Sequence, residues 1–137
     1  MTKWFFSALF FLFQTNIEAQ LSDFKSVNFE NADKIALNLK GADLSNLPGL
    51  AYNLTNSLTS DVEKFRAIYT WVCTNIENDY YGYRKNHSKR VKFQKDTIEQ
   101  YKWNAGFSKQ VFIKLLKEKK TICTGYAYLI KKLSKFG

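Results

Sequence analysis

The clearest fold signal in the chain is a helical period over residues 61–78. Its apolar side chains follow one another at spacings of three, four, three and four residues: Val62, Phe65, Tyr69, Val72 and Ile76. These spacings predict one face of an α-helix. Ser60 and Glu63 have the spacing of a capping box at its start. Ile68 and Cys73 widen the stripe to the breadth of a helix packed on a core, so we expect Cys73 to be buried.

A second predicted helix covers residues 123–136, and it begins at a cysteine. Its apolar positions have offsets of 0, 3, 4 and 7: Tyr126, Leu129, Ile130 and Leu133. A thiol in a first helical turn faces unpaired backbone N–H groups and the positive end of the helix dipole. Both conditions favour a nucleophilic cysteine. Gly125 would leave room for a substrate backbone, and Cys123 is therefore the candidate catalytic residue.

The remaining segments are less regular. Residues 34–39 fit a short strand or a short helix, and residues 50–58 fit a short helix. Gly82 marks a turn, after which residues 84–96, strongly basic and poor in apolar side chains, are expected to form an exposed loop. Residues 107–117 predict another helix, with Ser108 as its N-cap. The chain is therefore expected to be mainly α, with its last helix capped by Gly137.

The first nineteen residues have the pattern of a signal peptide. Lys3 precedes an apolar run over residues 4–13, and a more polar stretch leads to Ala19. Ten residues, apolar apart from Ser7, are too few to span a bilayer of about 30 Å as a helix. They have the length and flanks of a secretory signal, the alternative being a buried N-terminal helix. We expect cleavage before Gln20, an exported protein, and no stable insertion in the membrane after cleavage.

Charge is distributed unevenly. Residues 20–83 carry five basic and eight acidic side chains, whereas residues 84–137 carry fifteen basic and three acidic ones, a net charge of +12. Such asymmetry can indicate an anionic partner, although lysines alternating with apolar residues more often form the solvated face of a helix. No arginine cluster or nucleic-acid module accompanies the lysines, so nucleic acid is not expected. An anionic glycan or lipid fits the pattern better.

The two cysteines allow two interpretations. In an exported chain they could form a Cys73–Cys123 disulfide. Alternatively, Cys73 is a buried thiol and Cys123 an accessible one, which we favour. One histidine and two distant cysteines do not supply the four ligands of a structural zinc site, so neither a metal nor a cofactor is expected.

Two segments together resemble the transglutaminase-like superfamily of cysteine enzymes. The first runs from Phe65-Arg66-Ala67-Ile68-Tyr69-Thr70-Trp71-Val72 to Asn75-Ile76-Glu77-Asn78-Asp79-Tyr80. The second, Thr121-Ile122-Cys123-Thr124-Gly125-Tyr126-Ala127-Tyr128-Leu129, places Cys123 48 residues after Asn75. The order and the spacing match the family, whose cysteine opens a helix. The resemblance covers residues 57–137, after a signal peptide (1–19) and a lead-in segment (20–56).

The resemblance implies a papain-like α+β fold, of which this chain would hold the N-terminal helical part without the sheet. It further implies hydrolysis or acyl transfer at peptide or amide bonds of a protein or peptide substrate. In the family a histidine base and an orienting aspartate follow the cysteine. Of these catalytic residues, only the cysteine has a counterpart here, Cys123. His87 and Asp79 precede Cys123 in the sequence and so do not match the family order, and Trp71 is expected in the core rather than as an oxyanion donor. The chain alone is therefore expected to be an inactive fragment.

Two other functions remain open. The chain could be a small exported helical module whose basic half contacts an anionic partner and whose Cys123 is not catalytic. It could also be purely structural, with Cys73 and Cys123 joined as a disulfide. An enzyme requires Cys123 to be more reactive than Cys73, whereas equal reactivity or a disulfide between them would favour one of these alternatives.

Overall fold

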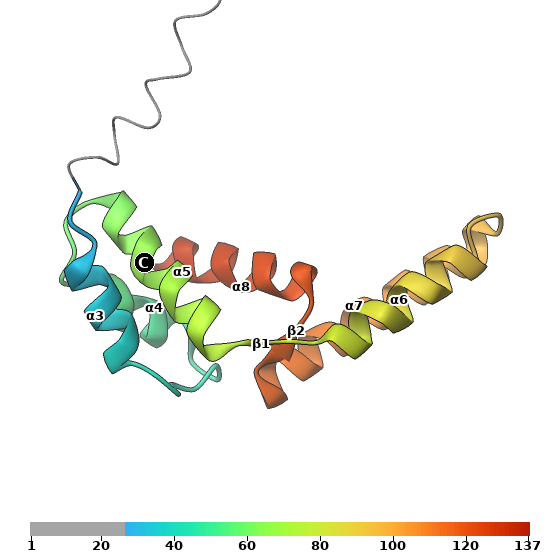
Figure 1. Ribbon diagram of the computed structural model, residues 1–137, viewed down its shortest axis with the longest axis horizontal. Coiled ribbons are helices and arrows are strands. Elements are labelled where there is room, and N and C mark those ends of the chain that lie inside the picture. Colours follow the sequence, from blue (N-terminus) through green and yellow to red (C-terminus); the bar gives the residue numbers. More distant parts are fainter. Residues whose placement is uncertain (1–26) are drawn as a thin grey trace, which may run out of the picture.

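The computed structural model describes residues 27–137 and is mainly helical, as expected. Figure 1 shows its elements in chain order, which are α3 (Glu30–Asn38), α4 (Leu47–Thr55), α5 (Asp61–Asn75), β1 (Glu77–Asn78), α6 (Tyr80–Lys92), α7 (Thr97–Glu118), β2 (Lys120–Thr121) and α8 (Cys123–Phe136). Residues 34–39, left open between strand and helix, belong largely to helix α3. No helix within residues 27–137 combines the length and the apolar character needed to cross a membrane.

Helices α3, α4, α5 and α8 pack into a bundle around one main core (Figure 1). The core is almost entirely aliphatic, with one tryptophan. Its buried members come from these four helices, from the loop before α4, from the residue after α5 and from α7: Ala36, Leu44, Leu50, Ala51, Leu54, Ile68, Trp71, Val72, Ile76, Leu115, Leu129 and Leu133. The lead-in residues thus contribute a large share of the side chains that cover α5 and α8.

Helix α5 begins at the predicted capping box, in which the Glu63 N–H donates to the Ser60 hydroxyl and the Ser60 N–H to the Glu63 carboxylate. Its buried face is rotated from the predicted one. Ala67, Ile68, Trp71 and Val72 are buried, whereas Phe65, Tyr69 and Cys73 are exposed.

The position of Trp71 explains this rotation. Its ring is fully buried and its indole N–H donates to the Leu39 carbonyl at 2.8 Å. On the α3 side, Asp33 accepts hydrogen bonds from Arg66 at 2.7 and 2.9 Å and from Thr70 at 2.8 Å. These contacts fix which face of α5 meets α3. The prediction that Cys73 is buried was therefore wrong.

Helices α6 and α7 form an antiparallel hairpin that projects from the bundle (Figure 1). Residues 84–96 are mostly exposed, as expected, but most of them are helical rather than a loop. Gly82 lies inside α6 instead of at a turn. Asp79 caps α6 by accepting from the Gly82 N–H at 3.0 Å. Three basic residues in its last turn favour the helix through the dipole, namely Lys89, Arg90 and Lys92.

Helix α7 is a single helix of 22 residues, capped by Asp96 and not by Ser108, which lies inside it. It is longer than predicted because its first half packs on α6. The Trp103 indole donates to the Asn86 side chain at 3.0 Å, and its ring lies beneath the Lys89 ammonium at 5.5 Å. These contacts depend on a partner helix, which the local sequence of α7 does not reveal.

Two parallel two-residue strands join the hairpin to the bundle. β1 pairs with β2 through Glu77 with Lys120 and Asn78 with Thr121. Helix α5 therefore ends at Asn75, three residues before the predicted end, because the chain becomes extended at Ile76 to enter β1. Gly137 caps α8, as predicted.

Candidate functional site

Cys123 is the first residue of α8, and its side chain is exposed. Ile122 precedes it with an extended backbone and supplies no side-chain hydrogen bond to the helix start. The Gly125 and Tyr126 N–H groups donate to the Ile122 carbonyl at 2.9 and 3.2 Å. The thiol thus lies in a first turn where the helix dipole stabilises negative charge. The predicted helix start and the accessibility of Cys123 are confirmed.

The strand pair brings the C-terminal end of α5 next to the start of α8. The Asp79 N–H donates to the Thr121 carbonyl at 2.7 Å. The Tyr126 hydroxyl, one turn after the cysteine, donates to the Ile76 carbonyl at 2.9 Å. The segments around residues 75–80 and 121–129 are therefore in direct contact.

Gly125 does not provide the open approach that its sequence position suggested. The residue is buried, and the Thr121 side chain fills the place where a Cβ would be. A Cβ added to Gly125 would overlap Thr121 Oγ1 and lie 2.8 Å from Thr121 Cβ. Thr121 is 1% exposed, and its hydroxyl has no hydrogen-bond partner within residues 27–137. Gly125 thus allows α8 to pack directly on β2.

Cys73 is a free, exposed thiol in the last turn of α5, and Cys123 is free as well. A hydrogen bond with Cys73 raises the pKa of Tyr69. Burial, followed by the electrostatic interaction with Cys73 and with Glu77, raises the pKa of Tyr126. Because both thiols are free, the two cysteines are not joined in this structure, which differs from the disulfide alternative.

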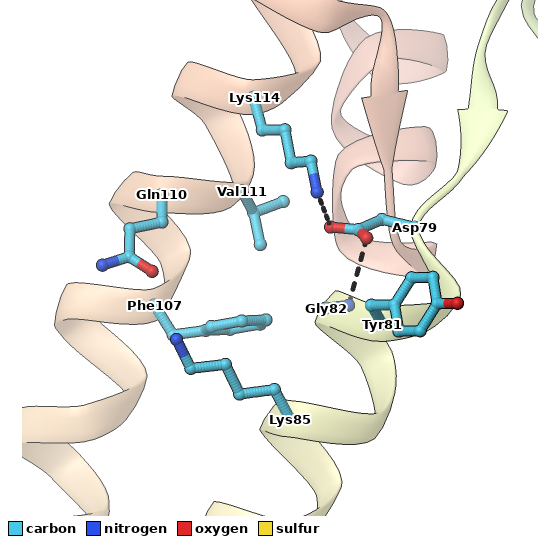
Figure 2. A pocket seen from close by; sticks show the side chains of 8 residues that line it. All are labelled: Asp79, Tyr81, Gly82, Lys85, Phe107, Gln110, Val111 and Lys114. Carbon is cyan, nitrogen blue, oxygen red and sulfur yellow. Dashed lines mark hydrogen bonds and ion pairs between the residues drawn. The ribbon is translucent and has the colours of Figure 1, made fainter.

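Asp79 has a structural role at the base of the hairpin (Figure 2). Its buried carboxylate accepts from Lys114 at 2.7 Å in addition to capping α6. Burial alone would raise the pKa of Asp79, but the hydrogen bonds from Lys114 and from the Gly82 N–H hold it below the usual value. Figure 2 shows this pair at one end of a hollow of about 250 Å³ between α6 and α7. Sequence reasoning missed Lys114, because it lies 35 residues after Asp79 and no local pattern links them.

His87 lies on α6, on the hairpin, and its ring stacks on Tyr83 with centroids 6.2 Å apart. It lines a shallow surface hollow together with Asn86 and Arg90, and Cys123 does not line that hollow. Trp71 is fully buried, as expected. Neither His87 nor Trp71 is therefore placed as a partner of the Cys123 thiol.

Within residues 27–137, no three side chains among His, Cys, Asp and Glu are grouped closely enough to hold a metal ion. The predicted signal peptide at residues 1–19 lies outside the described residues. What the fold and the site define is a mainly helical protein with an exposed thiol at the start of its last helix. No protein-family model, curated protein or solved structure matches the chain.

Proposed function

We propose that Cys123 is the nucleophile of an exported, transglutaminase-like cysteine hydrolase or acyltransferase that acts on peptide or amide bonds. The observation that carries the proposal is the exposed thiol at the first residue of α8, the helix that follows β2, and β2 pairs with β1 after the end of α5. The contact between the two segments of the family pattern supports it further. We also propose that these helices are the N-terminal part of a papain-like α+β domain, as the resemblance implies.

The reaction would proceed through a thioester. The Cys123 thiolate attacks the carbonyl carbon of the amide, a C–S bond forms, and the carbonyl oxygen takes up the negative charge. The C–N bond then breaks, and the amine leaves with a proton. Water or a second amine then attacks the thioester carbonyl, which releases the thiol together with an acid or a new amide. N–H groups at the start of α8 can stabilise the transient oxyanion.

The base is the part that these residues do not supply. The family pattern places a histidine and then an aspartate after the cysteine, and residues 124–137 contain neither. His87, the single histidine of the sequence, lies on α6. We therefore expect the chain to be acylated at Cys123 without catalytic turnover of the thioester.

Cys73 provides a matched internal control for the experiment. Both thiols are free and exposed, but Cys73 lies in the last turn of α5 and Cys123 in the first turn of α8. Charge at a helix end is stabilised or destabilised by about 0.3–1 kcal/mol, so the contrast between opposite ends corresponds to roughly a 3- to 30-fold difference in reactivity. Limited labelling of residues 20–137 with iodoacetamide at pH 7, followed by peptide mapping, should modify Cys123 first.

An acyl-transfer readout follows from the same preparation. Incubation with p-nitrophenyl acetate should leave an acetyl thioester on Cys123, which hydroxylamine removes, and Cys123→Ala should abolish it. Cys73→Ala should leave it intact. Equal labelling of the two cysteines, or preferential labelling of Cys73, would contradict an activated nucleophile and favour a non-catalytic binding module.

A further inference from the structure

The α6–α7 hairpin carries most of the excess positive charge on an element that contributes little to the core. Residues 80–118 hold ten basic and three acidic side chains, a net charge of +7. Only Val111 and Leu115, both in the second half of α7, are buried in these two helices. Figure 1 shows the far end of the hairpin projecting away from the bundle. Folding of the bundle therefore does not account for the composition of that end.

Most of this charge has no internal counterion. Among the ten basic side chains, only Lys102 and Lys114 form ion pairs with carboxylates within residues 27–137. Several others instead lie over aromatic rings, such as Lys85 and Lys89 over Trp103 at 5.9 and 5.5 Å. These contacts hold the cations close together without neutralising them, so their charges add at the surface.

Apolar side chains are exposed at the same end of the hairpin. Val91, in the last turn of α6, is 51% exposed, and Ile98 and Tyr101, in the first turns of α7, are 67% and 76% exposed. Ile98 and Tyr101 are three residues apart and therefore share one helix face, with Lys102 directly beside them. Basic residues flank this apolar group on the same tip: Lys89, Arg90, Lys92 and Lys95.

We infer that the hairpin tip, residues 89–102, is a peripheral binding site for an anionic lipid bilayer. The cations would lie at the headgroups, while Val91, Ile98 and Tyr101 enter the boundary of the acyl chains. A second copy of the chain is disfavoured, because two tips of the same charge repel each other. A water-soluble polyanion would match the cations but would leave the aliphatic side chains exposed to water.

The test uses the chain from residue 20 and sedimentation with vesicles of phosphatidylcholine, with or without 30% phosphatidylglycerol. We expect binding only to the anionic vesicles and a decrease as salt rises. One basic side chain near an anionic surface contributes roughly fivefold in affinity. Arg90→Gln/Lys92→Gln/Lys95→Gln should therefore weaken binding at least tenfold. The matched variant Lys34→Gln/Lys40→Gln/Lys131→Gln, which removes three exposed charges from the bundle, should weaken it much less.

A second pair of measurements separates a bilayer from a soluble polyanion. Ile98→Ser/Tyr101→Ser removes the exposed apolar side chains without altering the charge, and it should weaken vesicle binding while leaving retention on a heparin column unchanged. If this variant binds vesicles like the unmodified chain, the tip recognises polyanions in general and the lipid proposal is overturned. Absence of binding to anionic vesicles, or equal losses for the tip and bundle variants, would also overturn it.

Discussion

Replacing Gly125 by alanine tests the packing of α8 on β2, on which the position of Cys123 depends. The added Cβ would overlap Thr121 Oγ1 and lie 2.8 Å and 3.0 Å from Thr121 Cβ and Cγ2. Thr121 is fully buried and belongs to β2, which pairs with β1. Its side chain therefore cannot move away without disturbing the strand pair, and the helix must shift instead.

The expected size of the effect follows from two opposing terms. Overpacking a well-packed site costs typically about 1–3 kcal/mol, and three short contacts put Gly125→Ala near the upper end. Alanine in place of glycine in a helix returns up to about 1 kcal/mol. We expect a net loss of roughly 1–2 kcal/mol in the free energy of unfolding.

Two further variants isolate the contact. Gly106 lies in α7, is exposed, and has nothing within 4 Å of an added Cβ, so Gly106→Ala should stabilise the protein by up to about 1 kcal/mol. The same chemical change is thus expected to have opposite signs at two helical glycines. Thr121→Gly, which removes all three contacting atoms, should be destabilising alone but should cancel most of the cost of Gly125→Ala in the double variant.

Urea unfolding followed by circular dichroism at 222 nm measures all four proteins. A coupling free energy of about 1 kcal/mol or more between positions 121 and 125 is expected, with no coupling between positions 106 and 121. If Gly125→Ala were neutral or stabilising, or if its cost were unchanged by Thr121→Gly, the packing argument would be refuted. The helix start that presents Cys123 would then not depend on the glycine.

Two more predictions follow from the ion pair and from the N-terminus. Asp79→Asn keeps a capping oxygen for α6 but removes the ion pair with Lys114, so we expect a loss of about 1 kcal/mol at pH 7. The pKa of Asp79 in the folded protein lies below its ordinary value of 3.8, so this contribution is present above about pH 4 and is lost as the pH falls through the folded pKa. Urea midpoints of the variant and the unmodified protein should therefore converge at low pH, whereas a constant difference would exclude Asp79 as the cause. Mass spectrometry of the protein expressed from Met1 in a secreting host should show an N-terminus at Gln20, and an intact Met1 would remove the exported interpretation.

The sequence predicts helices best where caps and periodicity agree. Ser60 and Glu63 define the start of α5, and the spacing of Leu129 and Leu133 defines the buried face of α8; the structure confirms both. The rotation of α5 could not be read from its own apolar residues, because Phe65 and Tyr69 are large hydrophobic side chains that are suited to a core, as are Ile68 and Val72. A hydrogen bond from Trp71 to a carbonyl 32 residues away decides between the two faces, and contacts of that range leave no local pattern.

Helix α6 shows the opposite case, a helix without a buried face. No residue of α6 is buried, so its apolar pattern is weak and its basic composition resembles that of a loop. Its stability comes from the Asp79 cap, from cations in its last turn and from packing against α7. Of these, only the cap and the cations can be recognised in the sequence of α6 itself. An aspartate three residues before a glycine, as Asp79 is before Gly82, is also typical of a turn, so the cap does not identify a helix start.

The candidate site itself combines a local and a distant part. Placement of Cys123 at a helix start follows from residues 121–133 alone, because the helical period, the small residue at position 125 and the preceding extended residues are consecutive. The role of Gly125 does not follow, since a glycine beside a cysteine is equally suited to a close substrate and to a close threonine. The structure distinguishes them through Thr121, which is buried in β2. The glycine thus couples the nucleophile to the strand pair that joins α5 to α8, and a change at position 125 should alter the reactivity of Cys123 through the helix start rather than through substrate contact.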